Sequence, residues 1–352
     1  MRVCGTVAED PFDSRQSAPP VSTWTDPGAR FRGGLPTTHG HQAVTHATQP
    51  CAPKAYWSKG LMYCDRVERH WISLPENADH LHAFANADGT TSFPVEVTKT
   101  AVFFQIRLDS AGPLWFLLDS GAGTNYIDRG VATAEGLTFA GKAQVRGAGS
   151  GKVDVDVIPD VSFQLPGLVV RRQRFHATDL GPVQPAWGRR LDGFLGYHFL
   201  EHFVVDIDYA RRLMAVSDPA SYRETARGER LPLEIRERLP YVVGTVKIPG
   251  LAAQDSPFLV DSGSQDEVDH PLIGSGSDSS KGILAGQGLG MPIPGRLGRV
   301  ESLRLGSIEL RGLVGVSTET GLGSHLIGGG LLSRFRVVFN YPARTLTLAR
   351  PD

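Results

Sequence analysis

The feature that most constrains this chain is a short pattern that occurs twice. Residues 117–121 (LLDSG) and 259–263 (LVDSG) each join two large apolar residues to an acid, a hydroxyl and a glycine. The apolar run is typical of a buried strand. Burial of a carboxylate is costly unless partners satisfy it. A strand that carries Asp119 or Asp261 into a dry interior therefore predicts a built site.

The neighbours of each acid fit that interpretation. Gly121 and Gly263 permit a sharp reversal of the chain around the carboxylate, because glycine adopts backbone angles that other residues avoid. Ser120 and Ser262 supply hydroxyls that can hydrogen-bond to neighbouring backbone. A single copy would fit an ordinary turn, since Asp, Ser and Gly are common turn residues. Two copies in matching contexts indicate more than a turn.

A second pattern is also repeated, downstream of each acid. Residues 194–196 (FLG) and 326–328 (LIG) both join two apolar residues to a glycine. The offset that relates Gly196 to Gly328 also relates Tyr209 to Tyr341. An ungapped match over about twenty residues indicates an internal duplication, which outweighs a local motif as an indication of fold.

These paired motifs resemble those of the aspartic peptidases, in particular bacterial retropepsin-like proteins with two lobes in one chain. The resemblance covers roughly residues 92–352. It implies a mostly β fold of two duplicated retropepsin- or pepsin-like β-barrel lobes, related by a pseudo-twofold axis, and a largely irregular N-terminal segment. It also implies catalytic roles for Asp119 and Asp261, loop-bracing roles for Ser120, Gly121, Ser262 and Gly263, and packing beneath the loops for Gly196 and Gly328.

The resemblance implies an aspartic endopeptidase that acts on peptide or protein substrates. Two carboxylates held close together share a proton, because the charge of one raises the pKa of the other. The ionised acid takes a proton from a water, and the protonated acid hydrogen-bonds to the peptide carbonyl. This chemistry calls for no metal and no cofactor. A catalytically silent peptide-binding or regulatory protein on the same scaffold is the alternative, and a structural β protein whose repeats are only turns is a third interpretation.

The repeats predict the domain organisation. Residues 1–91 have scattered prolines and histidines without a sustained period, which predicts an irregular or disordered segment. Residues 92–216 are expected to form lobe 1 and residues 239–352 lobe 2, with a charged linker at 217–238. Each lobe carries one acid, so the active unit is expected to be a single chain and the protein a monomer.

Two glycine-rich stretches occupy corresponding places in the two lobes. A phosphate-binding loop is excluded at the first, because Arg146 and Val153 stand where that motif requires glycine and Ser or Thr. The resemblance favours flaps that close over the substrate, and glycine-rich loops have the mobility that such flaps need. Flexible hairpin tips are the alternative. The candidate flap residues are Gly147, Ala148 and Gly149 in lobe 1, and Gly286, Gln287 and Gly288 in lobe 2.

The loop after the second acid is unusually acidic. Asp266, Glu267 and Asp269 are expected to lie in a solvated loop, because clustered acids are seldom buried.

The composition excludes several other classes. A net charge of −1 argues against a general nucleic-acid binder. No apolar run approaches the roughly 20 residues of a membrane-spanning helix. The residues after Met1 lack the apolar core of a signal peptide. We therefore expect a cytoplasmic protein, or an exported one (periplasmic or secreted) if the natural start differs.

Overall fold

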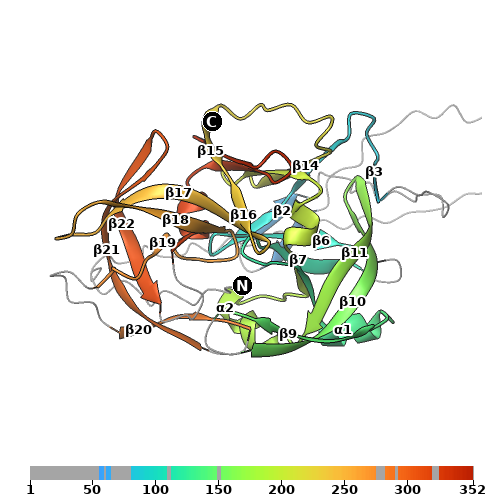
Figure 1. Ribbon diagram of the computed structural model, residues 1–352. Helices are drawn as coiled ribbons and strands as arrows, with labels where there is room; N and C mark the ends of the chain where they lie inside the picture. Colours follow the sequence, from blue (N-terminus) through green and yellow to red (C-terminus); the bar gives the residue numbers. More distant parts are fainter. Residues whose placement is uncertain are drawn as a thin grey trace, which may run out of the picture. The chain divides into compact units, whose positions relative to one another are not determined.

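The computed structural model describes residues 55–58, 61–64, 81–108, 112–148, 152–274, 282–289, 292–318 and 325–351. The chain divides into two compact units. In the smaller unit, Ala8–Glu68, strands β1 (Ala55–Ser58) and β2 (Leu61–Cys64) form an antiparallel pair. The larger unit contains Arg69–Asp352 and all the features discussed below (Figure 1). Its fold is mostly β, as the sequence predicts.

The first sheet of the larger unit holds the strand that leads to Asp119. It has nine strands in the order β5-β6-β7-β12-β8-β11-β10-β9, and β3 pairs with β11. The strands are β3 (His82–Phe84), β5 (Glu96–Thr98), β6 (Ala101–Ile106), β7 (Leu114–Leu118), β8 (Asn125–Asp128), β9 (Gly141–Arg146), β10 (Lys152–Leu165), β11 (Leu168–Thr178) and β12 (Gly193–Leu195).

The second sheet holds the strand that ends at Asp261. It has eight strands in the order β16-β17-β18-β23-β19-β22-β21-β20. The strands are β16 (Glu234–Arg236), β17 (Leu239–Lys247), β18 (Gln254–Asp261), β19 (Val268–Asp269), β20 (Gly282–Gln287), β21 (Pro292–Leu305), β22 (Ile308–Thr318) and β23 (Leu326–Gly328). When the strands of each eight-strand path are ranked by their place in the chain, the two paths have the same spatial arrangement of ranks. The two paths therefore share one topology.

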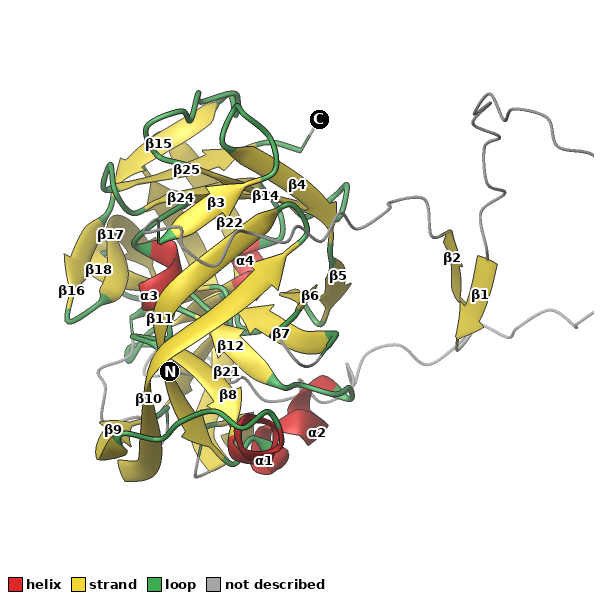
Figure 2. Cartoon of the chain, turned by 90° about the vertical axis from the view of Figure 1, so that its right-hand side faces the viewer, coloured by secondary structure: helices red, strands yellow, loops and turns green. Residues whose placement is uncertain are grey.

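A bridging sheet joins strands from both halves of the chain. Its six strands follow the order β15-β25-β24-β13-β14-β4, and β15, β25, β24, β14 and β4 are labelled toward the top of Figure 2. The strands are β4 (Thr90–Pro94), β13 (Val204–Asp208), β14 (Leu213–Ser217), β15 (Gly228–Pro232), β24 (Arg336–Asn340) and β25 (Thr345–Ala349). At its centre β13 pairs with β24, so this sheet ties the two halves together.

The helices are short. They are α1 (Arg129–Ala134), the 3-10 turn η1 (Gly181–Val183), α2 (Gln184–Trp187), α3 (Tyr197–Leu200) and α4 (Gly329–Leu332). The side chain of Asp128 caps α1 by accepting from the backbone N–H groups of Gly130 and Val131, which satisfies two donors that the first turn leaves free. Helices α3 and α4 directly follow Gly196 and Gly328.

Ordered strands extend beyond the predicted lobes. Strand β3 and the start of β4 fall within residues 1–91, and the predicted linker contains β15 and β16. These strands are short and only weakly apolar, so no hydrophobic period marks them in the sequence. They acquire their order from distant partners: Thr91 pairs with Val216, and Leu231 pairs with Leu346.

Candidate active site

The structure brings the two predicted acids together. Strands β7 and β18 carry Asp119 and Asp261 to neighbouring loops, and both side chains are fully buried. A Cβ atom added to Gly121 would lie 2.6 Å from either carboxylate oxygen of Asp261. A Cβ atom added to Gly263 would lie 2.7 and 2.8 Å from the carboxylate oxygens of Asp119. Each acid therefore rests against the glycine of the other loop, where no larger residue fits.

Two serines bind the loops to each other through reciprocal hydrogen bonds. The Ser120 hydroxyl donates to the carbonyl of Val260 (2.8 Å) and accepts from the backbone N–H of Ser262 (2.9 Å). The Ser262 hydroxyl donates to the carbonyl of Leu118 (2.9 Å) and accepts from the backbone N–H of Ser120 (3.0 Å). All four bonds are buried, so their loss would leave backbone groups without water as a substitute. The carboxylates are thus held on a rigid base.

The two downstream glycines pack beneath these loops. Strand β12 pairs in parallel with β7, and β23 pairs in parallel with β18, which brings Gly328 opposite Asp261. A Cβ atom at Gly196 would lie 2.5 Å from the carbonyl oxygen of Ala122, and one at Gly328 would lie 2.8 Å from the Ser264 hydroxyl. Only glycine permits this close approach.

The environment of the acids alters their ionisation. Burial raises the pKa of Asp119 well above its usual range, and the neighbouring charge of Asp261 raises it further. Loss of water around a buried carboxyl disfavours its charged form, and the negative charge of the neighbouring carboxylate repels a second one. The pair is therefore disposed to keep a proton under conditions in which an isolated aspartate would lose it.

Two tyrosines near the acids were not predicted to belong to the site. Tyr341 is buried, and its hydroxyl donates to the carbonyl of Ser120 (3.5 Å). Burial raises the pKa of Tyr341, and the charges of Asp119 and Asp261 add to the rise. The pKa of Tyr126 is also raised, by burial and then by Asp119. The sequence singled out Tyr341 only as the repeat of Tyr209. It did not indicate that Tyr341 lies near the acids.

The candidate flap residues of the two sheets meet each other. A Cβ atom at Gly288 would collide with the carbonyl oxygen of Ala148, and one at Gly147 would lie 3.4 Å from the Cβ of Leu289. Ala148 and Leu289 are both buried. Figure 1 shows β9 and β20 approaching the same region from the two sheets. Gly286 and Gln287 end β20, whereas Gly149 lies outside the described residues.

The acidic loop after Asp261 is not solvated, and that prediction is wrong. Asp266 is 8% exposed and Asp269 is fully buried. Asp269 accepts hydrogen bonds from the backbone N–H (3.2 Å) and the hydroxyl (2.6 Å) of Thr318. Glu267 forms an ion pair with Arg334. Asp269 and Glu267 are thus satisfied by partners that are distant in the sequence, whereas Asp266 accepts a hydrogen bond from the nearby Ser264 hydroxyl (3.3 Å).

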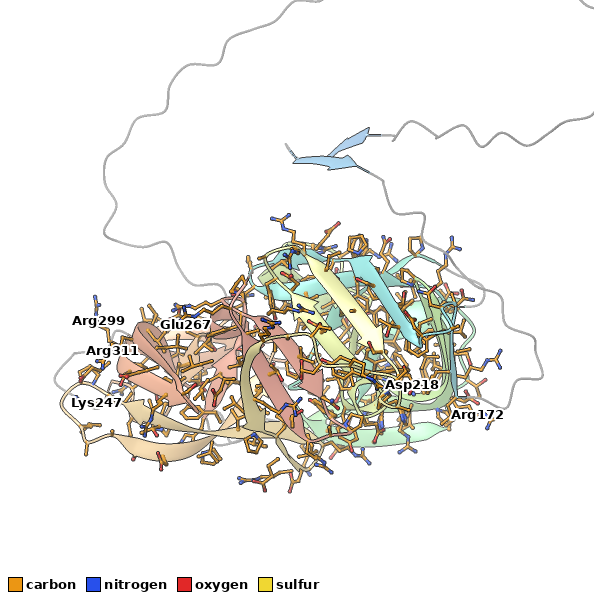
Figure 3. The ribbon with its side chains drawn as sticks, turned by 90° about the horizontal axis from the view of Figure 1, so that it is seen from above. Arg172, Asp218, Lys247, Glu267, Arg299 and Arg311 are labelled. Atoms are coloured by element: carbon orange, nitrogen blue, oxygen red, sulfur yellow. The ribbon has the colours of Figure 1, made fainter. Side chains whose placement is uncertain are left out.

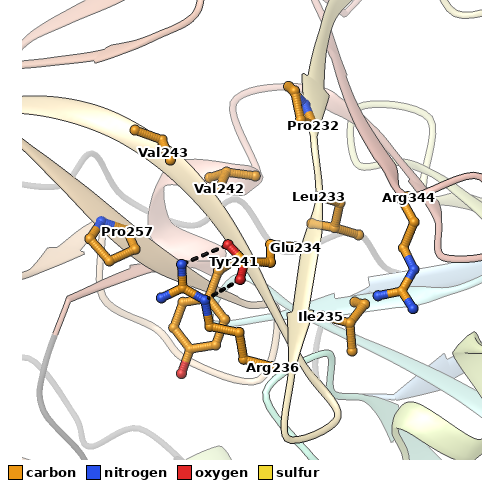
Figure 4. A pocket seen from close by; sticks show the side chains of 10 residues that line it. All are labelled: Pro232, Leu233, Glu234, Ile235, Arg236, Tyr241, Val242, Val243, Pro257 and Arg344. Atoms are coloured by element: carbon orange, nitrogen blue, oxygen red, sulfur yellow. Dashed lines mark hydrogen bonds and ion pairs between the residues drawn. The ribbon is translucent and has the colours of Figure 1, made fainter.

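A hollow of about 420 Å³ lies at the edge of the second sheet (Figure 4). Val243 and Pro257 form part of its wall, and Arg344 lies at the other side. Glu234 and Arg236 form an ion pair beside it (2.6 Å). None of its lining residues belongs to the two acid-bearing loops.

Comparison with known proteins supports an aspartyl protease family. Residues 104–199 match the family model described as Aspartyl protease. The matched segment contains Asp119 and Gly196 and ends before the second acid-bearing loop. No curated protein matches the chain. Among the described residues, no helix has the length and apolar character needed to cross a membrane.

Proposed function

We propose that this chain is an aspartic endopeptidase in which Asp119 and Asp261 form one catalytic dyad. The observation that carries the proposal is the pair of fully buried acids, each seated against the glycine of the other loop. The match of residues 104–199 to an aspartyl protease family supports it. In this proposal the first and second sheets are the cores of two duplicated, retropepsin-like lobes related by a pseudo-twofold axis, and each lobe supplies one acid.

The proposed reaction follows from one proton shared by two carboxyl groups. The ionised carboxylate accepts a proton from a water molecule held between the acids, while the protonated carboxyl donates a hydrogen bond to the peptide carbonyl oxygen. The water oxygen attacks the carbonyl carbon and gives a tetrahedral intermediate. That intermediate collapses when its C–N bond breaks and a carboxyl proton passes to the leaving nitrogen. No covalent bond to the enzyme forms.

The surrounding residues hold this arrangement. The serine hydrogen bonds fix the separation of the loops, because each hydroxyl binds backbone of the opposite loop. The contact between Ala148 and Gly288 would close the cleft over a bound peptide and exclude bulk water, which strengthens electrostatic interactions inside. In this proposal the meeting tips act as flaps.

The test is cleavage of an unfolded protein at acid pH by the purified full chain, with and without pepstatin. Asp119→Asn and Asp261→Asn should each abolish cleavage. Asp255→Asn is the matched control, because it removes the same charge from an exposed position of β18 and should leave cleavage intact. Persistent activity in either dyad variant would mean that the acids are misassigned. A wild-type chain that binds peptides without cutting them would favour the silent binding protein.

A further inference from the structure

One turn of the second sheet reaches the loop that carries Asp119. Glu237 and Arg238 connect β16 to β17 with positive φ angles of 49° and 68°. Gly121 and Gly123 of the Asp119 loop both face that side: Gly121 meets Asp261, and a Cβ atom at Gly123 would lie 3.8 Å from the Cβ of Arg238. Arg238 therefore contacts the Asp119 loop at Gly123, two residues after the glycine that meets Asp261.

Arg238 belongs to a group of unpaired cations. Arg238, Arg174 and Arg344 are exposed, and within the part of the chain that the structure describes none of their guanidinium groups forms an ion pair. Burial raises the pKa of Tyr197, and the charges of Arg344 and Arg238 oppose that rise. Burial lowers the pKa of His176 to about 4, and Arg174 and Arg238 contribute to the decrease. Arg238 therefore acts electrostatically on both Tyr197 and His176, and of the three arginines it is the one that contacts the Asp119 loop at Gly123.

The nearby acids do not neutralise this group. Glu201 is engaged by His198, whose Nδ1 lies 2.9 Å from its carboxylate. Glu237, the neighbour of Arg238 on the turn, is exposed, and no ion pair joins the two side chains within the described residues. A guanidinium without a carboxylate partner is available to a ligand, and its fork of N–H donors matches a carboxylate.

The corresponding place beside Asp261 is different. There the turn between β5 and β6 carries Lys99 and Thr100, also at positive φ (47° and 70°), so Thr100 stands where Arg238 stands in the other half. The Lys99 ammonium donates to the carbonyl of Ala186 (2.8 Å), and the amide of Gln265 donates to the same oxygen (3.5 Å). The ammonium of Lys99 is thus held by a backbone carbonyl, whereas within the described residues the guanidinium of Arg238 donates no hydrogen bond.

We propose that Arg238, beside the bare backbone of Gly123, forms a cationic subsite that selects substrates with a glutamate or aspartate near the scissile bond. This inference rests on the proposed endopeptidase function. Gly123 has no side chain to occupy the space next to the base of the Arg238 side chain.

The test uses a peptide that the full chain cleaves. Paired versions carry Glu or Gln at each of four positions on either side of the scissile bond, and kcat/KM is measured at about pH 6, where a free glutamate is ionised. We expect one position at which Glu exceeds Gln by up to about fivefold, the upper end of the range for an exposed ion pair. That preference should shrink at high salt and vanish at about pH 3, where the substrate acid is neutral.

Three variants isolate the role of Arg238. Arg238→Gln should bring the Glu-to-Gln ratio to about one, and Arg238→Lys should retain part of the preference. Arg299→Gln is the matched control: Arg299 is exposed on β21 and projects from the far edge of the second sheet (Figure 3), so the ratio should stay at the wild-type value. Thermal unfolding of each variant verifies that it is folded.

The outcomes separate this inference from the proposed function. Peptide cleavage without any Glu preference, or with a preference that survives Arg238→Gln, would overturn the cationic subsite and leave the endopeptidase intact. If Arg299→Gln lowers the ratio as much as Arg238→Gln, general charge rather than a subsite is responsible, and the inference also fails. If the wild-type chain cleaves no peptide, the proposed function and the subsite fall together.

Discussion

Ser120 and Ser262 show how single residues determine the rigidity of the site. Each hydroxyl both donates and accepts across the boundary between the two loops, so neither loop can shift without breaking two buried bonds. The glycines that follow them allow the acids to approach, and the serines keep them there.

Removal of either hydroxyl is therefore expected to reduce stability. Ser120→Ala leaves the Val260 carbonyl and the Ser262 N–H unsatisfied, so the free energy of unfolding should fall by about 1–3 kcal/mol. Ser262→Ala should do the same. Urea unfolding measures the loss, and Ser92→Ala on the exposed face of β4 is the control, with an expected change within about 0.5 kcal/mol. Equal losses at Ser92 and Ser120 would contradict the bracing role.

The raised pKa of Asp119 predicts a specific pH dependence of stability. A group whose pKa is higher in the folded than in the unfolded state contributes stability at low pH, and that contribution is lost as the pH rises through the folded-state value. Asp119→Asn cannot ionise. Its melting temperature should therefore equal that of the wild type at about pH 3, below the ordinary aspartate pKa, and exceed it increasingly toward neutral pH.

Asp255→Asn provides the baseline for that comparison, because it makes the same substitution at an exposed position of the same strand that carries Asp261. A difference between wild type and Asp119→Asn that stays constant with pH would show that Asp119 ionises normally. Cleavage should likewise peak on the acid side of neutrality and decline as the dyad loses its shared proton. A rate that still rises at about pH 9 would contradict a carboxylate pair.

At the scale of elements, the hairpins β9–β10 and β20–β21 depend on each other. Gly288 packs directly on the carbonyl oxygen of Ala148, and Leu289 is buried in a cluster that includes Val155 of β10. The tips therefore come from different sheets but share one core. Their contact requires a glycine at the point of closest approach.

Gly288→Ala is expected to separate the tips and to lower kcat/KM by at least about tenfold, because the cleft would no longer close around the peptide. Gly282→Ala is the matched control on the same hairpin, since a Cβ atom there meets nothing within 4 Å. Steady-state kinetics on one peptide compares the two variants. Equal activity of both would remove the flap role from Gly288.

Strand β3 and the first residues of β4 set the limit for N-terminal truncation. A chain that begins at residue 81 keeps β3 on β11 and β4 on β14, whereas one that begins at residue 92 loses β3 and two residues of β4. We expect the longer chain to melt at a clearly higher temperature than the shorter one. Identical melting temperatures would show that these pairings contribute little.

At the scale of the whole molecule, both acids and both sets of candidate flap residues belong to one chain. The bridging sheet joins β13 and β24 across the halves, and Asp206 binds Arg336 through two hydrogen bonds (2.9 and 2.7 Å). The two loops therefore meet without a second copy. Specific activity should not change when the protein is diluted from micromolar to nanomolar concentration. Activity that falls on dilution while light scattering detects a dimer would contradict the single-chain site.

The sequence by itself determined the local features of this protein. An apolar run, an acid and a glycine produce the two strand-to-turn units around Asp119 and Asp261, because the requirements for burial and for a sharp turn are met within a few residues. The repeated motifs also predicted a mostly β fold. The catalytic roles of the two acids stay a prediction.

Only the tertiary structure decided features that depend on distant partners. The burial of Asp269 requires Thr318, and the order of β15 requires its pairing with β25. The position of Arg238 at the Asp119 loop depends on the contact between its turn and Gly123. None of these pairs is close in the chain. The physical reason is that strand pairing and the burial of polar groups are set by neighbours across sheets, which no local pattern specifies.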